Sequence, residues 1–387
     1  IIMITLLTNI YYPNLTSTGY YMTRIVDSIN SLDNVQVITS KQTKQNKKND
    51  RIEEIHTIGN LNIRNKNLVI RVLDFFYFTI STLIITIRLV KPNSKVLMVT
   101  NPPTLILINP LIKKVRKTKS ILFLHDFFPF NYFLINNSFF LKPFKKIIIA
   151  IFGYSYKSFD KVIVIGDDMK EFYIKNFGSN QEIKVIPNWS EVSKFKNIKK
   201  PQNKMPVIQF AGNIGVYQTL DKFIEIYIKS NQVFEIDILG DGINISKCSK
   251  LKKLNNLKFL NLRGRFPREE QEKFLSYSDI GLITLKEGMF GLGVPSKFYN
   301  LLAAGKPILF IGDKNSEIYK QINKHEIGWV FSWDEEEEII KFLNKLPDKE
   351  LIEKLGIRSR EISENFFSEN EILSQIKNEI IELSELL

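Results

Sequence analysis

The chain has 387 residues, 44% hydrophobic and 25% charged, which is the balance of a folded, water-facing protein long enough for two domains. One cysteine, Cys248, excludes an intrachain disulfide, and three histidines at no ligand-like spacing give no reason to expect a metal. The net charge of +13 lies in the first half, with 25 Lys and Arg against 12 Asp and Glu through Ser190 and 29 of each after it. This asymmetry predicts an anionic partner for the first half: nucleic acid, an anionic bilayer or a phosphorylated substrate.

Short runs rich in β-branched residues alternate with helical patterns in the first half. The apolar start is interpreted as a first strand rather than a targeting segment, so we expect a cytoplasmic protein. The polar, basic segment 41–51 is predicted to be a loop. The alternation predicts a parallel sheet with helices on both faces. The predicted strands are 3–8, 35–39, 96–100, 120–124 and 161–165, with helices such as 20–32 and 68–89 between them.

The same alternation begins again after the polar stretch 194–204. Strands are predicted at 207–210, 234–239, 257–262, 280–284 and 307–311, and helices at 220–229, 268–276 and 295–304. The sequence therefore predicts an α/β fold of two Rossmann-like βαβ domains, 1–190 and 191–370, facing across a cleft that holds the active site. We expect the amphipathic helix 371–387 to pack back on the first domain.

Two motifs of the first half follow predicted strands. Gly19 lies where the chain enters a helix, a position at which backbone amides attract anions, although it could simply relieve strain in a βα loop. His125 and Asp126 follow strand 120–124. His125 could bind a sugar hydroxyl or take part in proton transfer, or it could only cap a strand end.

In the second half, three strand ends carry candidate binding residues. Gly212 and Gly215 would let amides approach an anion, with Asn213 and Gln218 as neutral donors. The G-x-x-G spacing is not a dinucleotide fingerprint. The segment 240–242 supplies Gly240 at the next strand end. At the third strand end, the backbone of Arg265 and Phe266 could bind a nucleobase edge. The alternative is that this segment is an ordinary turn into a helix.

The most informative stretch is 285–307. Its glycines, including Gly291 and Gly293, lead into a helix expected to begin at Pro295. Amides of this loop, the Ser296 hydroxyl and the Lys297 ammonium would converge on a diphosphate-sized anion site. The alternative is a capped helix with a surface lysine. P-loop spacing is absent, which disfavours an ATPase.

A membrane face is predicted in the first half. The run 75–87 is uncharged and mostly apolar but too short to span a bilayer, and a basic run follows at 113–119. Such a combination suits a face on an anionic membrane; a buried helix with a solvated basic loop is the alternative. No nucleic-acid module is recognised, so we expect no nucleic-acid partner. The residues assigned to this face are Phe75, Phe76, Lys113, Lys114, Arg116 and Lys117.

Taken in order, these segments resemble bacterial glycosyltransferases of family 4, which have the GT-B fold. The similarity covers nearly the whole chain and is greatest to the branch of polysaccharide and O-antigen assembly. It rests on Tyr11-Tyr12-Pro13 with Gly19, His125-Asp126-Phe127-Phe128-Pro129, Val185-Ile186-Pro187-Asn188-Trp189, the segment 210–215, Gly240-Asp241-Gly242, the segment 264–267, Val294-Pro295-Ser296-Lys297 and the segment 303–307.

The resemblance implies a retaining, metal-independent transfer with no cofactor. A nucleotide-diphosphate sugar would be the donor, held by 191–370, and a polyprenyl-diphosphate-linked sugar the acceptor, held by 1–190. It implies that the enzyme is peripheral on the inner face of the cell membrane. By the same resemblance, Gly19 and the segment 291–297 neutralise the leaving diphosphate, His125 contacts the sugar, and Arg265 with Phe266 contacts the base.

The chain departs from the family's pattern at charged positions. Many relatives carry two glutamates with seven residues between them, where this sequence has Leu292 and Asn300. Asn213 or a neighbour replaces the usual arginine and Gln218 the usual lysine, so Lys297 is expected to supply the cation. Because of the missing glutamates, a nucleotide-sugar epimerase of the same fold and a non-catalytic nucleotide-sugar binding protein remain alternatives.

Overall fold

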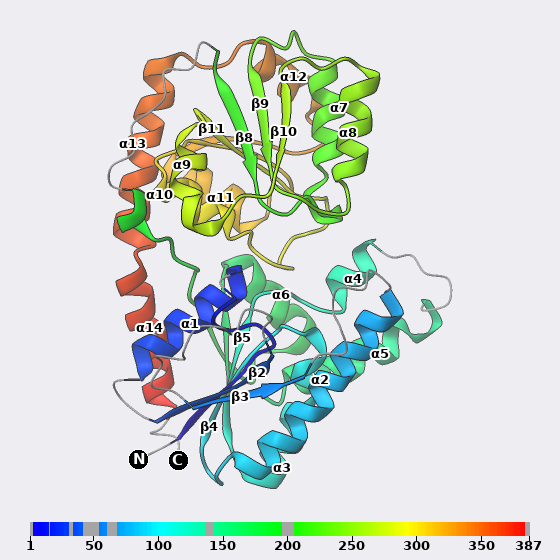
Figure 1. The fold of residues 1–387 in the computed structure, drawn as a ribbon, viewed down its shortest axis with the longest axis vertical. Helices are drawn as coiled ribbons and strands as arrows, with labels where there is room; N and C mark the ends of the chain where they lie inside the picture. The colour runs from blue at the N-terminus through cyan, green and yellow to red at the C-terminus, as the bar shows by residue number, and fades with distance from the viewer. Residues whose placement is uncertain are drawn as a thin grey trace. The chain divides into compact units, whose positions relative to one another are not determined.

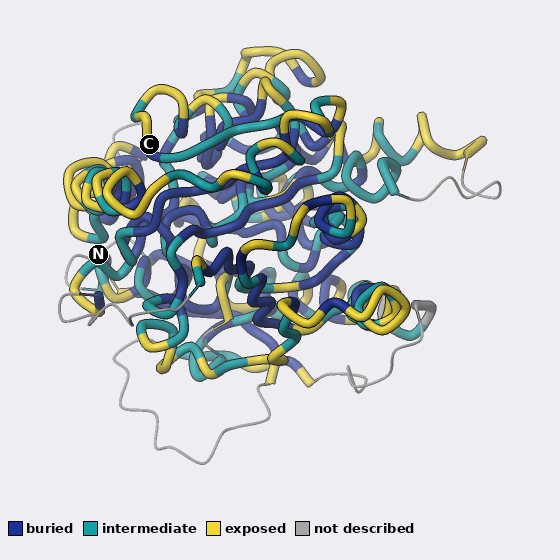
Figure 2. The backbone as a smooth tube through the Cα atoms, turned by 90° about the horizontal axis from the view of Figure 1, so that it is seen from above, coloured by how far each residue is buried: buried dark blue, intermediate teal, exposed yellow. Residues whose placement is uncertain are grey.

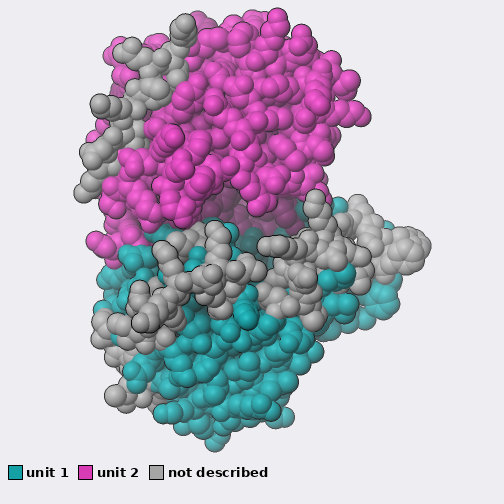
Figure 3. Space-filling model, viewed as in Figure 1, with its two compact units in different colours: residues 1–187, 372–387 teal, residues 188–371 magenta. Residues whose placement is uncertain are grey.

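The computed structural model describes residues 3–14, 16–30, 34–41, 54–59, 68–135, 142–195 and 205–383. The chain divides into two compact units (Figure 3): unit 1 is Ile1–Pro187 with Ile372–Leu387, and unit 2 is Asn188–Glu371. The divisions fall within a few residues of the boundaries expected at 190 and 370. Most of the predicted loop 41–51 and of the polar stretch 194–204 lies outside the described residues.

Unit 1 is built on a parallel sheet of order β3-β2-β1-β4-β5-β6-β7. Registers such as Ile4 with Val35 and Ile4 with Lys95 place β1 between β2 and β4. Interior strands are buried along their whole length, as expected for a parallel sheet covered on both faces. The strands are β1 (Ile4–Leu7), β2 (Val35–Ser40), β3 (Glu54–Ile58), β4 (Lys95–Val99), β5 (Lys119–Leu124), β6 (Lys161–Val164) and β7 (Glu182–Val185).

The helices of unit 1 connect these strands, and the last helix of the chain joins them (Figure 1). The long predicted helix 68–89 is present with those bounds as α2 (Leu68–Leu89). The others are α1 (Ser17–Ile29), the 3-10 helix η1 (Pro103–Ile108), α3 (Asn109–Arg116), α4 (Phe130–Ile135), η2 (Lys142–Phe144), α5 (Lys145–Tyr156), α6 (Asp167–Phe177) and α14 (Glu369–Glu382).

Helix α14 is bound to unit 1 by two buried lysines. Lys95 donates from Nζ to the Ile380 carbonyl at 2.8 Å. Lys161 is hydrogen-bonded to Glu379 and lies 3.3 Å from both Glu382 and Glu182. Burial is the largest single influence and would lower the pKa of Lys161, but the carboxylates of Glu379, Glu382 and Glu182 together outweigh it and the pKa is raised. The charge of Lys161 is thus compensated by the carboxylates around it.

We expect the change Glu379→Gln to lower the free energy of unfolding by about 3 kcal/mol, because it leaves a buried ammonium without its nearest counter-charge. Glu382→Gln is the matched control: its side chain is 54% exposed, so its loss should cost less than about 1 kcal/mol. Urea unfolding followed by circular dichroism measures both. Equal effects of the two changes would contradict the assignment of Glu379 as the main counter-charge of Lys161.

Unit 2 repeats the architecture with a parallel sheet of order β10-β9-β8-β11-β12-β13. The α/β class, with two parallel sheets, is confirmed. Its strands are β8 (Val207–Ala211), β9 (Glu235–Leu239), β10 (Leu260–Gly264), β11 (Ile280–Thr284), β12 (Ile308–Ile311) and β13 (Gly328–Phe331). Its helices are η3 (Val192–Phe195), η4 (Val216–Gln218), α7 (Leu220–Ile228), α8 (Ile245–Leu254), η5 (Arg268–Glu270), α9 (Gln271–Ser276), α10 (Lys297–Ala303), α11 (Glu317–His325), α12 (Glu336–Asn344) and α13 (Lys349–Phe366).

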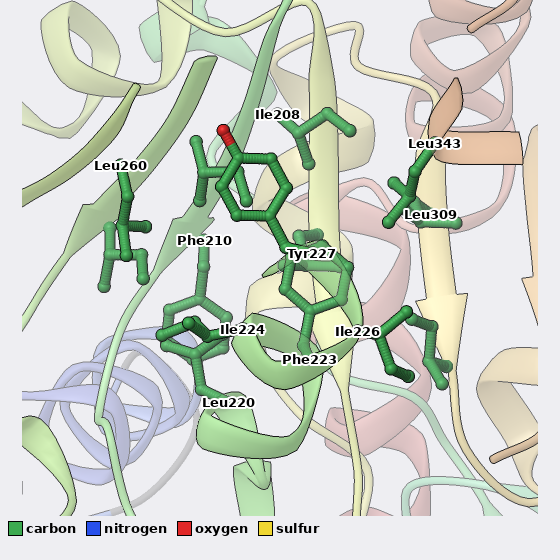
Figure 4. Packing of buried hydrophobic residues seen from close by; sticks show 14 of the residues in the cluster. Ile208, Phe210, Leu220, Phe223, Ile224, Ile226, Tyr227, Leu260, Leu309 and Leu343 are labelled. Atoms are coloured by element: carbon green, nitrogen blue, oxygen red, sulfur yellow. The ribbon is translucent and has the colours of Figure 1, made fainter. Parts of the chain in front are cut away.

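The core of unit 2 lies between its sheet and α7. Ile208 and Phe210 of β8 meet Leu220, Phe223 and Tyr227 of α7, all without measurable exposure (Figure 4). Burying each such side chain contributes roughly 1.5–3 kcal/mol. Figure 2 shows the same pattern along the chain, with buried strands inside and exposed residues on the outer turns of helices. This core fixes β8, whose carboxyl end carries the candidate site.

Candidate functional site

Three loops meet at the carboxyl edge of the sheet in unit 2. The Gly212 N–H donates to Leu239 O at 2.9 Å, and the Gly240 N–H to Gly264 O at 2.6 Å. A Cβ on Gly240 would lie 1.8 Å from the Gly212 carbonyl oxygen, and its φ is +140°. Only glycine allows this approach. The ends of β8, β9 and β10 are therefore joined through their backbones.

Lys297, the first residue of α10, projects over the end of β8. Its Nζ lies 3.4 Å from the centroid of the Phe210 ring, and a Cβ on Gly212 would be 3.5 Å from it. The Nζ atom is inaccessible to solvent and has no hydrogen-bond partner among the described residues. Burial lowers the pKa of Lys297 to about 7. A buried ammonium held only by a ring face is a cation that an anionic ligand would stabilise.

The loop before α10 carries the other residues predicted for this anion site. Gly291 and Gly293 have φ values of +70° and +156°. The helix begins at Lys297, two residues later than expected, and Ser296 does not cap it through its side chain. Asn300 is half-buried on the same helix. Lys297 therefore contributes the positive charge, since a helix of seven residues adds little dipole of its own.

The Gly212 loop differs from its prediction. Both of its glycine amides have partners within the protein, because Gly212 donates to Leu239 and Gly215 donates to Oε1 of Gln218 at 3.0 Å. These two N–H groups are thus not free to meet an anion in this conformation. The exposed Asn213 side chain is what this loop offers a ligand.

Arg265 and Phe266 follow β10. The Arg265 side chain is 78% exposed, with Nε 3.3 Å from the Asp241 carboxylate. The Phe266 ring packs on Phe274 with centroids 5.1 Å apart. The turn then enters η5 through Pro267. These contacts hold the segment at the same sheet edge as Gly240.

In unit 1, Gly19 and His125 belong to the carboxyl edge of that sheet. Gly19 is buried in the first turn of α1, where a Cβ would lie 1.9 Å from the Asn14 carbonyl oxygen. The structure thus accounts for this glycine by close packing. Thr100 accepts hydrogen bonds from the backbone N–H groups of His125 and Asp126, both at 3.3 Å.

The His125 ring lies edge-on to Tyr21 of α1, with centroids 6.4 Å apart. Burial lowers the pKa of His125 to about 4. The imidazole is therefore neutral at physiological pH, with one nitrogen able to donate and the other to accept a hydrogen bond.

The six residues assigned to a membrane face fall into two groups. Lys113 pairs with Asp160 at 2.9 Å, and Arg116 donates to the Ile87 carbonyl at the end of α2. Phe75 is partly buried. Phe76, Lys114 and Lys117 are exposed. The first group makes contacts within unit 1, which leaves the second group for an external surface.

Sequence reasoning did not single out Phe210, which forms the floor beneath Lys297, or Thr100, which holds the His125 backbone. Phe210 had a signal, because it lies two residues before Gly212 on a predicted strand. Thr100 had none beyond its position at the end of another strand.

The chain is similar to known proteins in sequence and in fold. The sequence model described as Glycosyltransferase Family 4 matches residues 21–193. A Pseudomonas aeruginosa protein named "Probable glycosyltransferase WbjE" is 28% identical over 370 residues, 91% of each chain. The structure of WaaG, a glycosyltransferase involved in lipopolysaccharide biosynthesis, aligns with a TM-score of 0.71 at 12% identity over 97% of this chain and 99% of that one. Anabaena HepE in complex with UDP-glucose aligns with a TM-score of 0.73 at 12% identity over all of both chains.

Two parallel α/β units of this kind, which align with WaaG over nearly the whole chain, have the GT-B fold. In sequence, the chain is similar to glycosyltransferase family 4 over residues 21–193 and to a probable glycosyltransferase over 91% of its length.

Proposed function

We propose that the protein is a retaining glycosyltransferase of cell-surface polysaccharide biosynthesis. It moves a hexosyl group from a nucleotide-diphosphate sugar to a polyprenyl-diphosphate-linked glycan, without a metal or other cofactor. It acts from the cytoplasm, peripheral on the anionic inner face of the cell membrane. The involvement of WaaG in lipopolysaccharide biosynthesis and the UDP-glucose bound to HepE support this proposal.

The observation that carries the proposal is the unpartnered ammonium of Lys297. A nucleoside diphosphate gains negative charge as it leaves the sugar, so a fixed cation that meets it lowers the barrier to transfer. Lys297 is held in place by Phe210 and shielded from water. Its attraction for a diphosphate is therefore stronger than that of a solvated lysine.

The remaining assignments follow the same logic. The neutral imidazole of His125 would hydrogen-bond a hydroxyl of the donor sugar. The segment at Arg265 and Phe266 would bind the base, since it extends from the sheet edge that carries Lys297. Asn213 and Asn300 would act as neutral donors around the phosphates.

The test is a thermal-shift screen of nucleotide sugars, because a ligand that binds only the native state raises its stability. For each donor that binds, release of the nucleoside diphosphate is then measured with and without a lipid-linked acceptor. Acceptor-dependent release is expected of the transferase. Release without acceptor would indicate an epimerase, and binding without turnover would indicate a non-catalytic binding protein.

A further inference from the structure

Helix α2 has its more apolar side on the outside. Side chains on its inner side are at most 4% exposed and include Asp74, Thr79, Thr82 and Thr86. Its outer side carries Leu73, Phe76, Tyr77, Ile80 and Ile84, each more than 40% exposed. A helix on the surface of a water-soluble protein normally shows the reverse arrangement. The outer side of α2 is thus suited to an apolar environment.

Thr79 on the inner side and the backbone of α2 bind the helix to η1 of unit 1. The hydroxyls of Thr79 and Thr104 are 2.7 Å apart, and Thr104 also donates to the Phe75 carbonyl at 3.3 Å. The helix is the connection between β3 and β4. The window 72–89 is long and apolar enough to cross a membrane, with a mean hydropathy of 1.7. Crossing would pull Thr79 from its partner and would place Asp74 and the inner threonines in hydrocarbon, which is costly. The helix is therefore suited to lie on a bilayer rather than span it.

Helix α5, with η2 before it, presents a second apolar stripe. Phe144, Ile147, Ile151 and Tyr154 are each more than 50% exposed, at spacings of three and four residues that place them on one face of a helix. Both α2 and α5 pack against η1. Figure 1 shows the two helices on the same side of unit 1.

The charge around these stripes is almost entirely positive. Between residues 68 and 157 the sequence has two acidic residues, the buried Asp74 and, at the carboxyl end of β5, Asp126. Exposed basic residues flank both helices: Lys142, Lys145 and Lys146 at the start of α5, Arg88 and Lys91 at the end of α2, and Lys114 and Lys117 at the end of α3. Apolar stripes with basic flanks are the composition that binds anionic lipid surfaces.

We propose that the outer faces of α2 and α5 form one docking surface that lies flat in the headgroup region of an anionic bilayer. A second copy of the chain is a poorer occupant, because it would bring the same positive charge to the interface. The inference gives the membrane association proposed above a defined surface, and it does not depend on the donor chemistry of Lys297.

The test is sedimentation of the full chain with vesicles of phosphatidylglycerol and phosphatidylethanolamine. The double change Phe76→Gln with Ile80→Gln should weaken binding at least about tenfold at any salt concentration, because it removes inserted apolar area. The changes Ile243→Gln with Leu254→Gln are the matched control, since those side chains are 75% and 71% exposed in unit 2. This control should bind as the wild type does.

Two double variants, each of which removes two positive charges, complete the experiment. Lys142→Gln with Lys146→Gln should weaken binding roughly tenfold at low salt and make it less sensitive to salt. Lys250→Gln with Lys253→Gln, exposed lysines of unit 2, makes the same change in net charge and should have no such effect.

Donor binding, measured by thermal shift in the same variants, should be unchanged. A wild type that binds vesicles but no donor would refute the proposed function and leave this surface intact. Vesicle binding that the α2 and α5 changes do not alter would overturn the inference. So would variants that change only self-association in analytical ultracentrifugation.

Discussion

Replacing Lys297 with alanine should lower turnover by about 10²–10³-fold, the usual loss when one fixed group that stabilises a developing negative charge is removed. The stability of the fold should change little or rise, because a buried cation without a hydrogen-bond partner is removed. The measurement is the rate of nucleoside diphosphate release at saturating acceptor, together with thermal unfolding of the unliganded protein.

Lys222 provides the control for this experiment. Its ammonium also lies over an aromatic ring of unit 2, 4.8 Å from the centroid of Trp333, but the side chain is 43% exposed. Lys222→Ala should therefore leave turnover nearly unchanged. Equal turnover in Lys297→Ala and the wild type would remove the diphosphate role from this lysine.

Donor affinity should fall as the pH rises above 7. Burial lowers the pKa of Lys297 from 10.5 to about 7 in the unliganded protein, and a bound diphosphate would raise it again by stabilising the ammonium. Below pH 7 the lysine is charged in both states, so affinity is constant. Above pH 7 binding must take up a proton, and affinity should drop by about tenfold per pH unit until the pKa of the bound state is reached.

This profile is measured by isothermal titration calorimetry with a nucleotide sugar, whose diphosphate does not titrate in this range. Buffers of different ionisation enthalpy report the proton uptake directly. Lys297→Gln should bind weakly with a flat profile. A wild-type affinity independent of pH between 7 and 9, with no proton uptake, would show that Lys297 keeps its charge before the donor arrives.

Nearly all of the strands that sequence analysis located lie in the interior of the two sheets. The strands that it missed lie at the sheet edges. β3, β7 and β13 were not predicted, and β10 was placed about two residues early. A continuous apolar run identifies a strand that is buried on both faces. Edge strands such as β3, with exposed Glu54 and Thr57, lack such a run. Their pairing depends on neighbours distant in sequence.

The candidate site could be predicted from the sequence to a similar extent as the strands. Lys297 was found because glycines, a serine and a lysine occur together in the sequence. The use of the Gly212 and Gly215 amides within the protein was not found, since it depends on how neighbouring loops approach each other. The pairing of Lys113 with Asp160 was missed for the same reason, because the partner is remote in sequence.

Unit 1 is discontinuous, since α14 closes it only after all of unit 2 has been passed. During translation, unit 2 therefore emerges complete while unit 1 still lacks the helix that covers Lys95 and Lys161. A chain released early by the ribosome would carry an intact second unit beside a first unit in which Lys95 and Lys161 lack their hydrogen bonds to α14.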